Sequence, residues 1–156
     1  MADATYRVVV LTADETHPIR LAVLRADTVS KQVEFAEDQW PGALHLGVRD
    51  AAGELVAVSS WIPRERATHP GVPAVQLRGM ATLQGVQGRG VGTLLVEAGC
   101  ARAAAGGARL VWANGRDAAL GFYLSHGFTV DSEGFIEAVT ELPHHVIVRR
   151  VDRAES

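Results

Sequence analysis

The first forty residues show the pattern of a strand, then that of a helix, and then no regular pattern. In residues 6–12 apolar and polar side chains alternate and many side chains are β-branched, which predicts an opening strand. In residues 16–26 the apolar positions, from Ile19 to Ala26, recur at helical spacing, so we expect a helix there. Residues 28–42 have no clean period, and we expect a loop with room for one helical turn.

A β-hairpin is predicted in the next part of the chain. Residues 44–49 and 55–62 are strand-like runs, and the connection between them, residues 50–53, ends in glycine. Residues 63–73 are predicted to form a loop, because their prolines fix φ and remove hydrogen-bond donors. The next strand is expected at residues 75–82.

A longer amphipathic helix follows. From Gly88 to residue 105 the apolar positions form one helical face, and Gly106 and Gly107 end it. Residues 110–113 then read as a short buried strand. This helix is expected to pack on the sheet.

The C-terminal part predicts one more helix and two closing strands. The helix covers residues 117–126, with Asp117 as its N-cap. The strands are expected at residues 128–130 and, after a break at Pro143, at residues 145–151.

This order of elements predicts a mixed α/β fold in which the hairpin makes part of the sheet antiparallel. The chain has 156 residues, of which 47% are hydrophobic, so it has the size of one domain that can bury a full core. No repeat, linker or low-complexity segment divides it. We therefore expect a single domain over residues 1–156.

Composition narrows the classes of partner. A formal charge of -3 and a pI near 6.0 give no broad basic field, which argues against nucleic acid or an anionic membrane surface. No run approaches the ~18 apolar residues of a membrane span, and no signal-peptide core is present, so we expect a soluble protein. Cys100 is the only cysteine, which suits a cytoplasmic location. The histidines show no metal-ligand spacing, so no metal is expected.

The glycines at positions 88, 90 and 92 stand between a predicted strand and a predicted helix. Backbone N–H groups at such a turn can bind an anionic group, a phosphate above all. A Walker A loop would need a lysine followed by serine or threonine, and the only lysine is Lys31. The dinucleotide fingerprint needs G-x-G-x-x-G after a first strand, whereas this chain has G-x-G-x-G in its middle. Simple packing of helix on strand is the alternative that these residues leave open.

Two segments resemble the GNAT superfamily of N-acetyltransferases. Residues 87–92, QGRGVG, resemble its Q/R-x-x-G-x-G/A signature, and residues 118–128, AALGFYLSHGF, resemble its A-x-x-F-Y-x-x-x-G-F segment. The resemblance covers about residues 44–150, and LRGMAT, VWANGR and PHHVIVRR also look like one branch of small bacterial-type members. It implies the acyl-CoA N-acyltransferase fold, with a mixed, mostly antiparallel central sheet flanked by helices.

The resemblance also implies acetyl-CoA or another acyl-CoA as co-substrate, bound where two adjacent parallel strands separate. The pantetheine arm would pair with the strand that ends at Thr82, and the pyrophosphate would lie on the amides of residues 88–93, with Arg89 as a charged supplement. At the position seven before the family's tyrosine this chain has Arg116 instead of asparagine, and Asn114 stands nearby. The candidate cofactor-binding residues are Met80, Ala81, Thr82, Gln87, Gly88, Arg89, Gly90, Val91, Gly92, Thr93, Asn114, Arg116 and Phe122.

The resemblance assigns Tyr123 as the residue that protonates the leaving thiolate. Such general acid help is typically worth ~10² to 10⁴ in rate. The two predicted strands between which the acyl-CoA would bind, residues 75–82 and 110–113, contain no acidic residue that could act as the base. We therefore take His144 as the candidate base, with its neighbour His145 as the alternative, because imidazole exchanges protons near neutral pH. Successive residues of a strand point to opposite faces, so at most one of the two enters the site.

The first functional hypothesis is an N-acetyltransferase in which a primary amine of a small molecule or peptide attacks the thioester directly. The alternative is a non-catalytic acyl-CoA-binding or regulatory module, favoured by the missing acidic base, and a nucleotide-binding protein is the third hypothesis. The acidic residues Glu34, Glu37 and Asp38 suggest a preference for cationic amines, or only a solvated face. Many proteins of the family form dimers, so the resemblance leaves a homodimer open.

Overall fold

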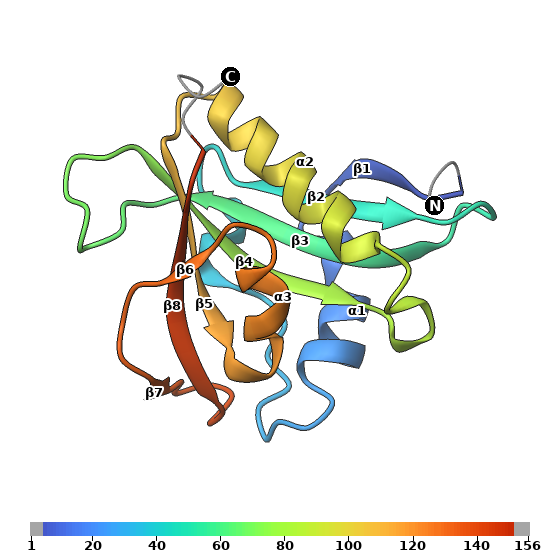
Figure 1. The fold of residues 1–156 in the computed structure, drawn as a ribbon. Coiled ribbons are helices and arrows are strands. Elements are labelled where there is room, and N and C mark those ends of the chain that lie inside the picture. The colour runs from blue at the N-terminus through green and yellow to red at the C-terminus, as the bar shows by residue number, and fades with distance from the viewer. Residues whose placement is uncertain (1–4, 152–156) are drawn as a thin grey trace.

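The computed structural model describes residues 5–151, which form one eight-stranded sheet in the order β1-β2-β3-β4-β5-β8-β6, with β7 paired to β8 (Figure 1). All neighbouring strands are antiparallel except β4 and β5, which are parallel. The strands are β1 (Arg7–Leu11), β2 (Leu44–Arg49), β3 (Leu55–Pro63), β4 (Ala74–Thr82), β5 (Leu110–Arg116), β6 (Thr129–Val130), β7 (Phe135–Ile136) and β8 (Pro143–Arg150).

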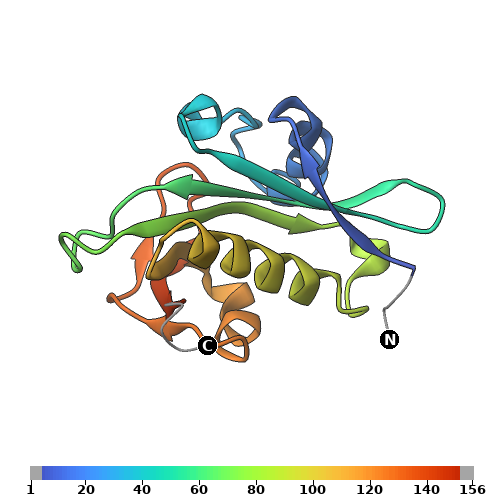
Figure 2. The ribbon, with the colours of Figure 1, turned by 90° about the horizontal axis from the view of Figure 1, so that it is seen from above.

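Helical segments cover both faces of the sheet (Figure 2). Helices α2 (Val91–Ala105) and α3 (Leu120–Leu124) lie on one face, and the helical stretch 14–24 lies on the other. That stretch consists of η1 (Asp14–Thr16), α1 (His17–Ile19) and the π-helical η2 (Arg20–Leu24). Three short 3-10 turns complete the set: η3 (Ala36–Gln39), η4 (Gln84–Val86) and η5 (Asp117–Ala119).

The main core lies between the sheet and α2 with α3. Apolar residues from β2, β3, β4 and β5 meet those of α2 there, with Trp61, Leu95, Tyr123 and Phe128 among the larger buried side chains. A smaller cluster around Leu11 lies on the opposite face, beneath the N-terminal helical stretch. Because apolar side chains are buried on both faces of the sheet, the strands that carry the candidate site are held in place by packing.

The predicted mixed, mostly antiparallel sheet with flanking helices is therefore present, and the hairpin and the helix after the glycine turn are confirmed. Two strand boundaries were wrong by two or more residues, and several others differ by one. Strand β5 continues past residue 113 to Arg116, and β8 already begins at Pro143. A proline is tolerated at the first residue of a strand, where no ladder donor is lost from its interior.

The prediction of Asp117 as an N-cap was also wrong. No side-chain cap bond forms at either η5 or α3, and the Asp117 carboxylate instead accepts from Nδ1 of His145 at 2.7 Å. The helix ends at Leu124 rather than at residue 126. The predicted helix over 16–26 is a mixed helical stretch that ends at Leu24, and the short strand β7 was not predicted.

Candidate active site

The parallel strands β4 and β5 pair only at one end. Their register runs from Ala74 opposite Leu110 to Gln76 opposite Trp112, although β4 continues to Thr82 and β5 to Arg116. Beyond Gln76, therefore, the edge of β4 that faces β5 has no partner strand. Such an edge presents backbone donors and acceptors that an extended amide-bearing ligand can pair with.

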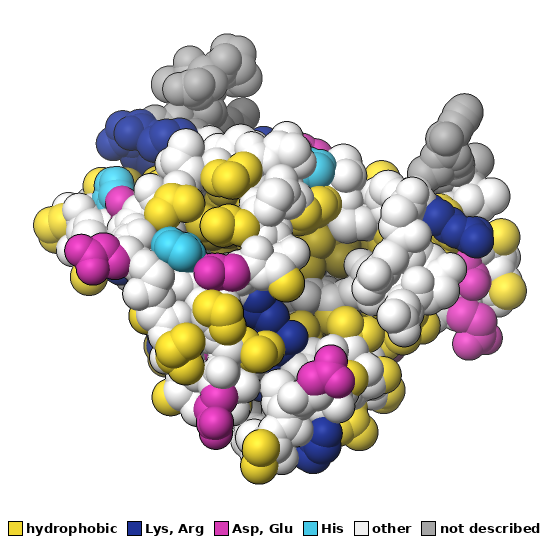
Figure 3. All heavy atoms as spheres, turned by 60° about the horizontal axis from the view of Figure 1, so that its bottom comes forward, with side chains coloured by type: hydrophobic (Ala, Val, Ile, Leu, Met, Phe, Trp, Pro, Cys, Tyr) yellow, Lys and Arg dark blue, Asp and Glu magenta, His cyan; other side chains and the backbone are white. Residues whose placement is uncertain are grey.

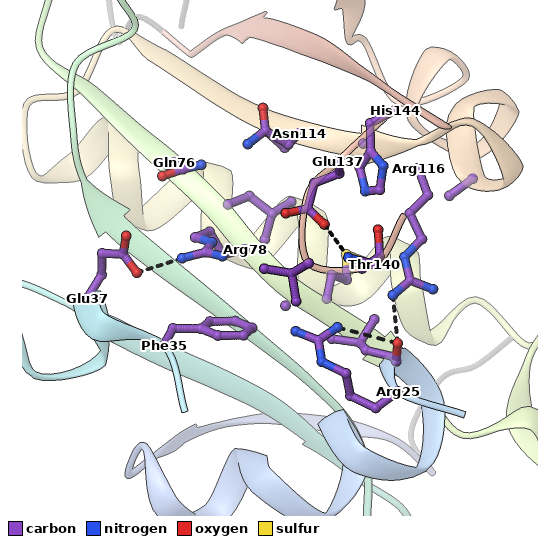
Figure 4. A pocket seen from close by; sticks show the side chains of 18 of the residues that line it. Arg25, Phe35, Glu37, Gln76, Arg78, Asn114, Arg116, Glu137, Thr140 and His144 are labelled. Atoms are coloured by element: carbon purple, nitrogen blue, oxygen red, sulfur yellow. Dashed lines mark hydrogen bonds and ion pairs between the residues drawn. The ribbon is translucent and has the colours of Figure 1, made fainter. Parts of the chain in front are cut away.

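A cavity of about 370 Å³ fills this opening. Its walls come from β4, β5, the segment 24–37, helix α3 and the segment 137–144 (Figure 4). Figure 3 looks onto a hollowed face of the molecule, where basic and acidic side chains lie among apolar ones. The cavity is at the lower end of the ~300 to 1,000 Å³ typical of small-molecule sites.

Strand β4 bends where it enters this cavity. Its register with β3 shifts between Val58 and Ser60, and Gly79 has a φ of +61°. As a result Leu77 and Met80, three residues apart, both pack against the main core, while Arg78 between them lies over the ring of Phe35. A bulge of this kind re-aims side chains that strict alternation would place elsewhere.

Tyr123 lines the cavity from α3. Its ring packs edge-on against Phe122 and Phe128, at centroid distances of 5.3 and 5.5 Å. No described residue hydrogen-bonds the hydroxyl group, and its oxygen is not among the fully buried polar atoms that lack a partner. Burial raises the pKa of Tyr123 to about 12, with Arg116 acting in the opposite direction. The phenol is therefore a protonated donor at neutral pH.

His144 lines the same cavity from β8. Its Nδ1 donates to the carbonyl oxygen of Leu142 at 2.8 Å, which leaves the lone pair of the neutral ring on Nε2. No described residue bonds Nε2, and that atom is not among the fully buried polar atoms without a partner either. His145 points to the other face and contacts Asp117, so one histidine of the pair enters the site.

Asn114 and Arg116 lie on the same face of β5, two residues apart, and both line the cavity. The Arg116 guanidinium donates to the carbonyl oxygen of Leu24 at 2.7 Å, from the segment opposite. Asn114 is exposed, and its side chain has no hydrogen-bond partner among the described residues. Of the two, Asn114 is the side chain that is free to bind a pantetheine amide.

The three glycines of the turn serve different purposes. Gly88 and Gly90 have φ of +84° and +82°, and a Cβ at either would meet nothing within 4 Å. They shape the left-handed turn before α2 and place no side chain of their own beside its start. A Cβ at Gly92 would lie 3.2 Å from Phe122 and 3.3 Å from Met80, so this glycine allows close packing of the helix.

Other residues around the turn have structural roles as well. The Gln87 side-chain amide donates to the Thr82 carbonyl at 3.1 Å, and the Thr93 hydroxyl lies 2.9 Å from Nε2 of His126. Val91 is 1% exposed, so only its backbone can meet a ligand. Arg89 is exposed beside the turn. The first N–H groups of α2 receive no side-chain cap, and they form the candidate pyrophosphate site.

The acidic residues 34–38 are mostly neutralised by arginines that the sequence did not single out. Glu37 accepts from Arg78 at 2.5 Å and pairs with Arg64 at 2.9 Å. Asp38 pairs with the buried Arg20, with nitrogen–oxygen distances of 2.8 and 2.9 Å. Only Glu34 among the three is exposed.

Besides Arg78, two charged residues of the cavity were missed by sequence reasoning. Glu137, just after β7, accepts from the Thr140 N–H at 2.8 Å. Burial alone would raise the pKa of Glu137, but this hydrogen bond and others from residues 139–140 hold it below the ordinary value. Arg25 is 6% exposed and contributes its guanidinium to the wall (Figure 4). Neither stands in a motif, so only the fold brings them together.

Comparison with known proteins points to one family. A family model described as "Acetyltransferase (GNAT) family" matches residues 13–128. The chain is 29% identical over 143 residues to the uncharacterized N-acetyltransferase YitI of Bacillus subtilis (strain 168), a match that covers 92% of this chain and 94% of that protein.

Solved structures show the same fold. A proposed N-acetyltransferase of Lactobacillus plantarum superposes with a TM-score of 0.78 at 16% identity, over 94% of this chain and 99% of that one. An acyl-CoA N-acyltransferase of Pseudomonas aeruginosa superposes with a TM-score of 0.73 at 17% identity, over 93% and 99%.

Within residues 5–151 no helix is long and apolar enough to cross a bilayer, and no group of three metal-ligating side chains could hold an ion. The wedge between β4 and β5, the glycine turn at the start of α2 and the family match over most of the chain agree with one another. The chain belongs to the GNAT family of acyl-CoA-dependent N-acyltransferases.

Proposed function

We propose that the protein transfers an acetyl group from acetyl-CoA to a primary amine by direct attack, without a covalent enzyme intermediate. The observation that carries this proposal is the pair of open polar atoms in one cavity. The hydroxyl of Tyr123 and Nε2 of His144 both lack partners among the described residues and both line the opening of the wedge.

The residues present fit an acyl-CoA. The free edge of β4 from Leu77 to Thr82 suits the amides of a pantetheine arm, and Asn114 adds a free side-chain amide. Gly88 and Gly90 place no side chain at the turn, and the start of α2 has no side-chain cap, which suits a pyrophosphate. When bound, the thioester supplies an activated acyl carbon and a thiolate leaving group.

The two polar groups divide the proton transfers. His144 accepts a proton from the attacking amine at Nε2, because its Nδ1 is held as a donor to Leu142. Tyr123 donates a proton to the departing sulfur, and its pKa of about 12 keeps that proton on the phenol until sulfur leaves. The new bond joins nitrogen to the acyl carbon, and the bond that breaks joins that carbon to sulfur.

The test of the acid is Tyr123→Phe, assayed by release of free CoA thiol with a panel of amines. We expect kcat to fall by ~10² to 10⁴ while acetyl-CoA binding by calorimetry is unchanged, since the ring and its packing remain. Tyr6→Phe, at the only other tyrosine, is the matched control and should keep full activity. Binding of acetyl-CoA with no turnover of any amine by the wild type would refute the enzyme and favour a regulatory module.

The test of the base uses the two neighbouring histidines. His144→Gln should lower kcat/KM by ~10² or more, whereas His145→Gln, on the opposite face, should change it only a few-fold. Equal losses in the two variants would show that His144 has no special part in proton transfer. The pH–rate profile separates a lost base from a lost fold, because only the former removes one limb of the profile.

A further inference from the structure

Two arginines in the cavity wall converge on one carbonyl oxygen. Arg116 of β5 donates to the oxygen of Leu24 at 2.7 Å, and Arg25 reaches the same oxygen at 3.4 Å (Figure 4). Arg25 is fixed further by a 2.7 Å bond from Nε to the Gln32 carbonyl. The chain therefore holds two guanidinium groups side by side facing the cavity.

Neither group has a carboxylate within 4.0 Å among residues 5–151. By contrast, other buried or half-buried arginines such as Arg20, Arg66 and Arg78 are each paired with an acid. Burial lowers the pKa of Arg25, and the neighbouring Arg116 lowers it further. Placing like charges together in a wall of low dielectric is costly unless an anion offsets them.

The other charges that face this pair are few. The negative charge of Glu137 raises the pKa of both arginines, and that of Asp27 raises the pKa of Arg116, although neither carboxylate is within ion-pair distance. Arg78 and Arg20 act on Arg25 but are themselves paired with Glu37 and Asp38. Among the arginines that line the cavity, Arg78 is paired with Glu37, whereas Arg25 and Arg116 have no carboxylate partner among the described residues. A ligand with an anionic group would supply the partner that both guanidinium groups lack.

The pair also stands at the right place relative to the proposed base. Arg116 is the direct register partner of His144 across β5 and β8, and both side chains line the cavity. Directly opposed residues of antiparallel strands have Cβ atoms ~5 Å apart. Because both side chains start from neighbouring positions and line the same cavity, one bound molecule can contact the Arg116 guanidinium and His144 together.

We propose that the acceptor is an amine that carries a carboxylate, an amino-acid-type molecule whose carboxylate is held by Arg25 and Arg116 while its amino group faces His144. This rests on the proposed N-acetyltransferase function and names its substrate class. A guanidinium pair recognises a carboxylate through several parallel N–H donors. Of the three acidic residues that suggested a preference for cationic amines, Glu37 and Asp38 are paired with arginines, and only Glu34 is left without an arginine partner in the described part of the chain.

The test compares acceptors that differ only at the anionic group. Each of the standard amino acids is offered with acetyl-CoA beside its amide, its decarboxylated amine and an aminoalkyl phosphate of similar length. We expect at least one amino acid to be acetylated with a kcat/KM 10-fold or more above that of its amide. In Arg116→Gln and Arg25→Lys this ratio should fall at least 10-fold, while Arg7→Gln, an exposed arginine on β1, keeps it.

The outcomes distinguish failure of the carboxylate site from failure of the acetyltransferase function. If amines are acetylated but the amide or the decarboxylated amine is as good as the acid, the carboxylate site is refuted and the acetyltransferase stands. If the aminoalkyl phosphate is the better acceptor, the arginine pair selects a phosphate and the carboxylate assignment falls. If acetyl-CoA binds and no amine of any kind is acetylated, the proposed function itself fails. A ratio unchanged in both arginine variants would also overturn the assignment.

Discussion

Gly99 in α2 lies against the indole of Trp61 so closely that a methyl group cannot be added without movement. A Cβ built there would lie 1.9 Å from Cζ2 of Trp61 and 2.1 Å from Cε2. Carbon atoms in contact are ~3.5 to 4.0 Å apart, so Gly99→Ala requires the helix and the indole to separate by roughly 1.6 Å. Trp61 is 2% exposed and its Nε1 donates to Ser59 at 2.9 Å, so the ring cannot turn away freely.

The expected magnitude follows from two opposing effects. Overpacking of a dense core costs ~1 to 3 kcal/mol, and occasionally more. Alanine in a helix interior gains back ~1 kcal/mol relative to glycine. Because the overlap involves rigid ring atoms, we place the net loss at about 2 kcal/mol, toward the upper part of the range. For a chain of this size that corresponds to a Tm lower by ~4 to 8 °C.

Urea unfolding of wild type, Gly99→Ala and the matched control Gly121→Ala tests this. A Cβ at Gly121 in α3 would meet nothing within 4 Å, so that variant should be neutral or slightly stabilised. Trp61→Leu should relieve the clash, so the cost of Gly99→Ala in that background should largely vanish in a double-mutant cycle. If Gly99→Ala is as stable as the wild type, the close packing of α2 against Trp61 is refuted. The position of α2 on the sheet, which also places the proposed pyrophosphate site, would then be in question.

Two further predictions concern buried ionisable groups. Asp38→Asn leaves the Arg20 guanidinium, 1% exposed, without its carboxylate and should destabilise the fold by ~3 to 5 kcal/mol in urea unfolding, whereas exposed Asp14→Asn should change it by less than ~0.5. Burial raises the pKa of Cys100 from 9.0 to about 11, so above pH 9 the unfolded thiol loses its proton first and stability falls as pH rises. Between pH 8 and 10 the wild type should lose ~1.3 kcal/mol more than Cys100→Ala, and parallel pH slopes would contradict a buried thiol.

The strands, the hairpin and the main helix could be predicted because their signals are local. The short turn of the hairpin and the glycines that stand before and after α2 are signals that depend only on neighbours a few residues away. Boundaries were less predictable. The extension of β5 to Arg116 follows from pairing with β8, whose residues lie about thirty positions further along the chain.

The site divides in the same way. The glycine turn and the segment around Tyr123 carry motifs, so the sequence by itself identified the family and the class of donor. The charged residues on the opposite wall of the cavity do not belong to any motif. Arg25, Arg116 and Glu137 come from three separate segments. Arg116 was expected to contact the cofactor, and we propose that it contacts the acceptor.

Sequence alone therefore determined the elements, the family and the donor class, because periodicity and short motifs are properties of contiguous residues. Only the tertiary structure decided that β4 and β5 part after Gln76, that His144 and not His145 faces the opening, and that Arg25 meets Arg116 there. Each of these depends on strand register and on packing between distant segments, and no local pattern of side chains encodes that geometry.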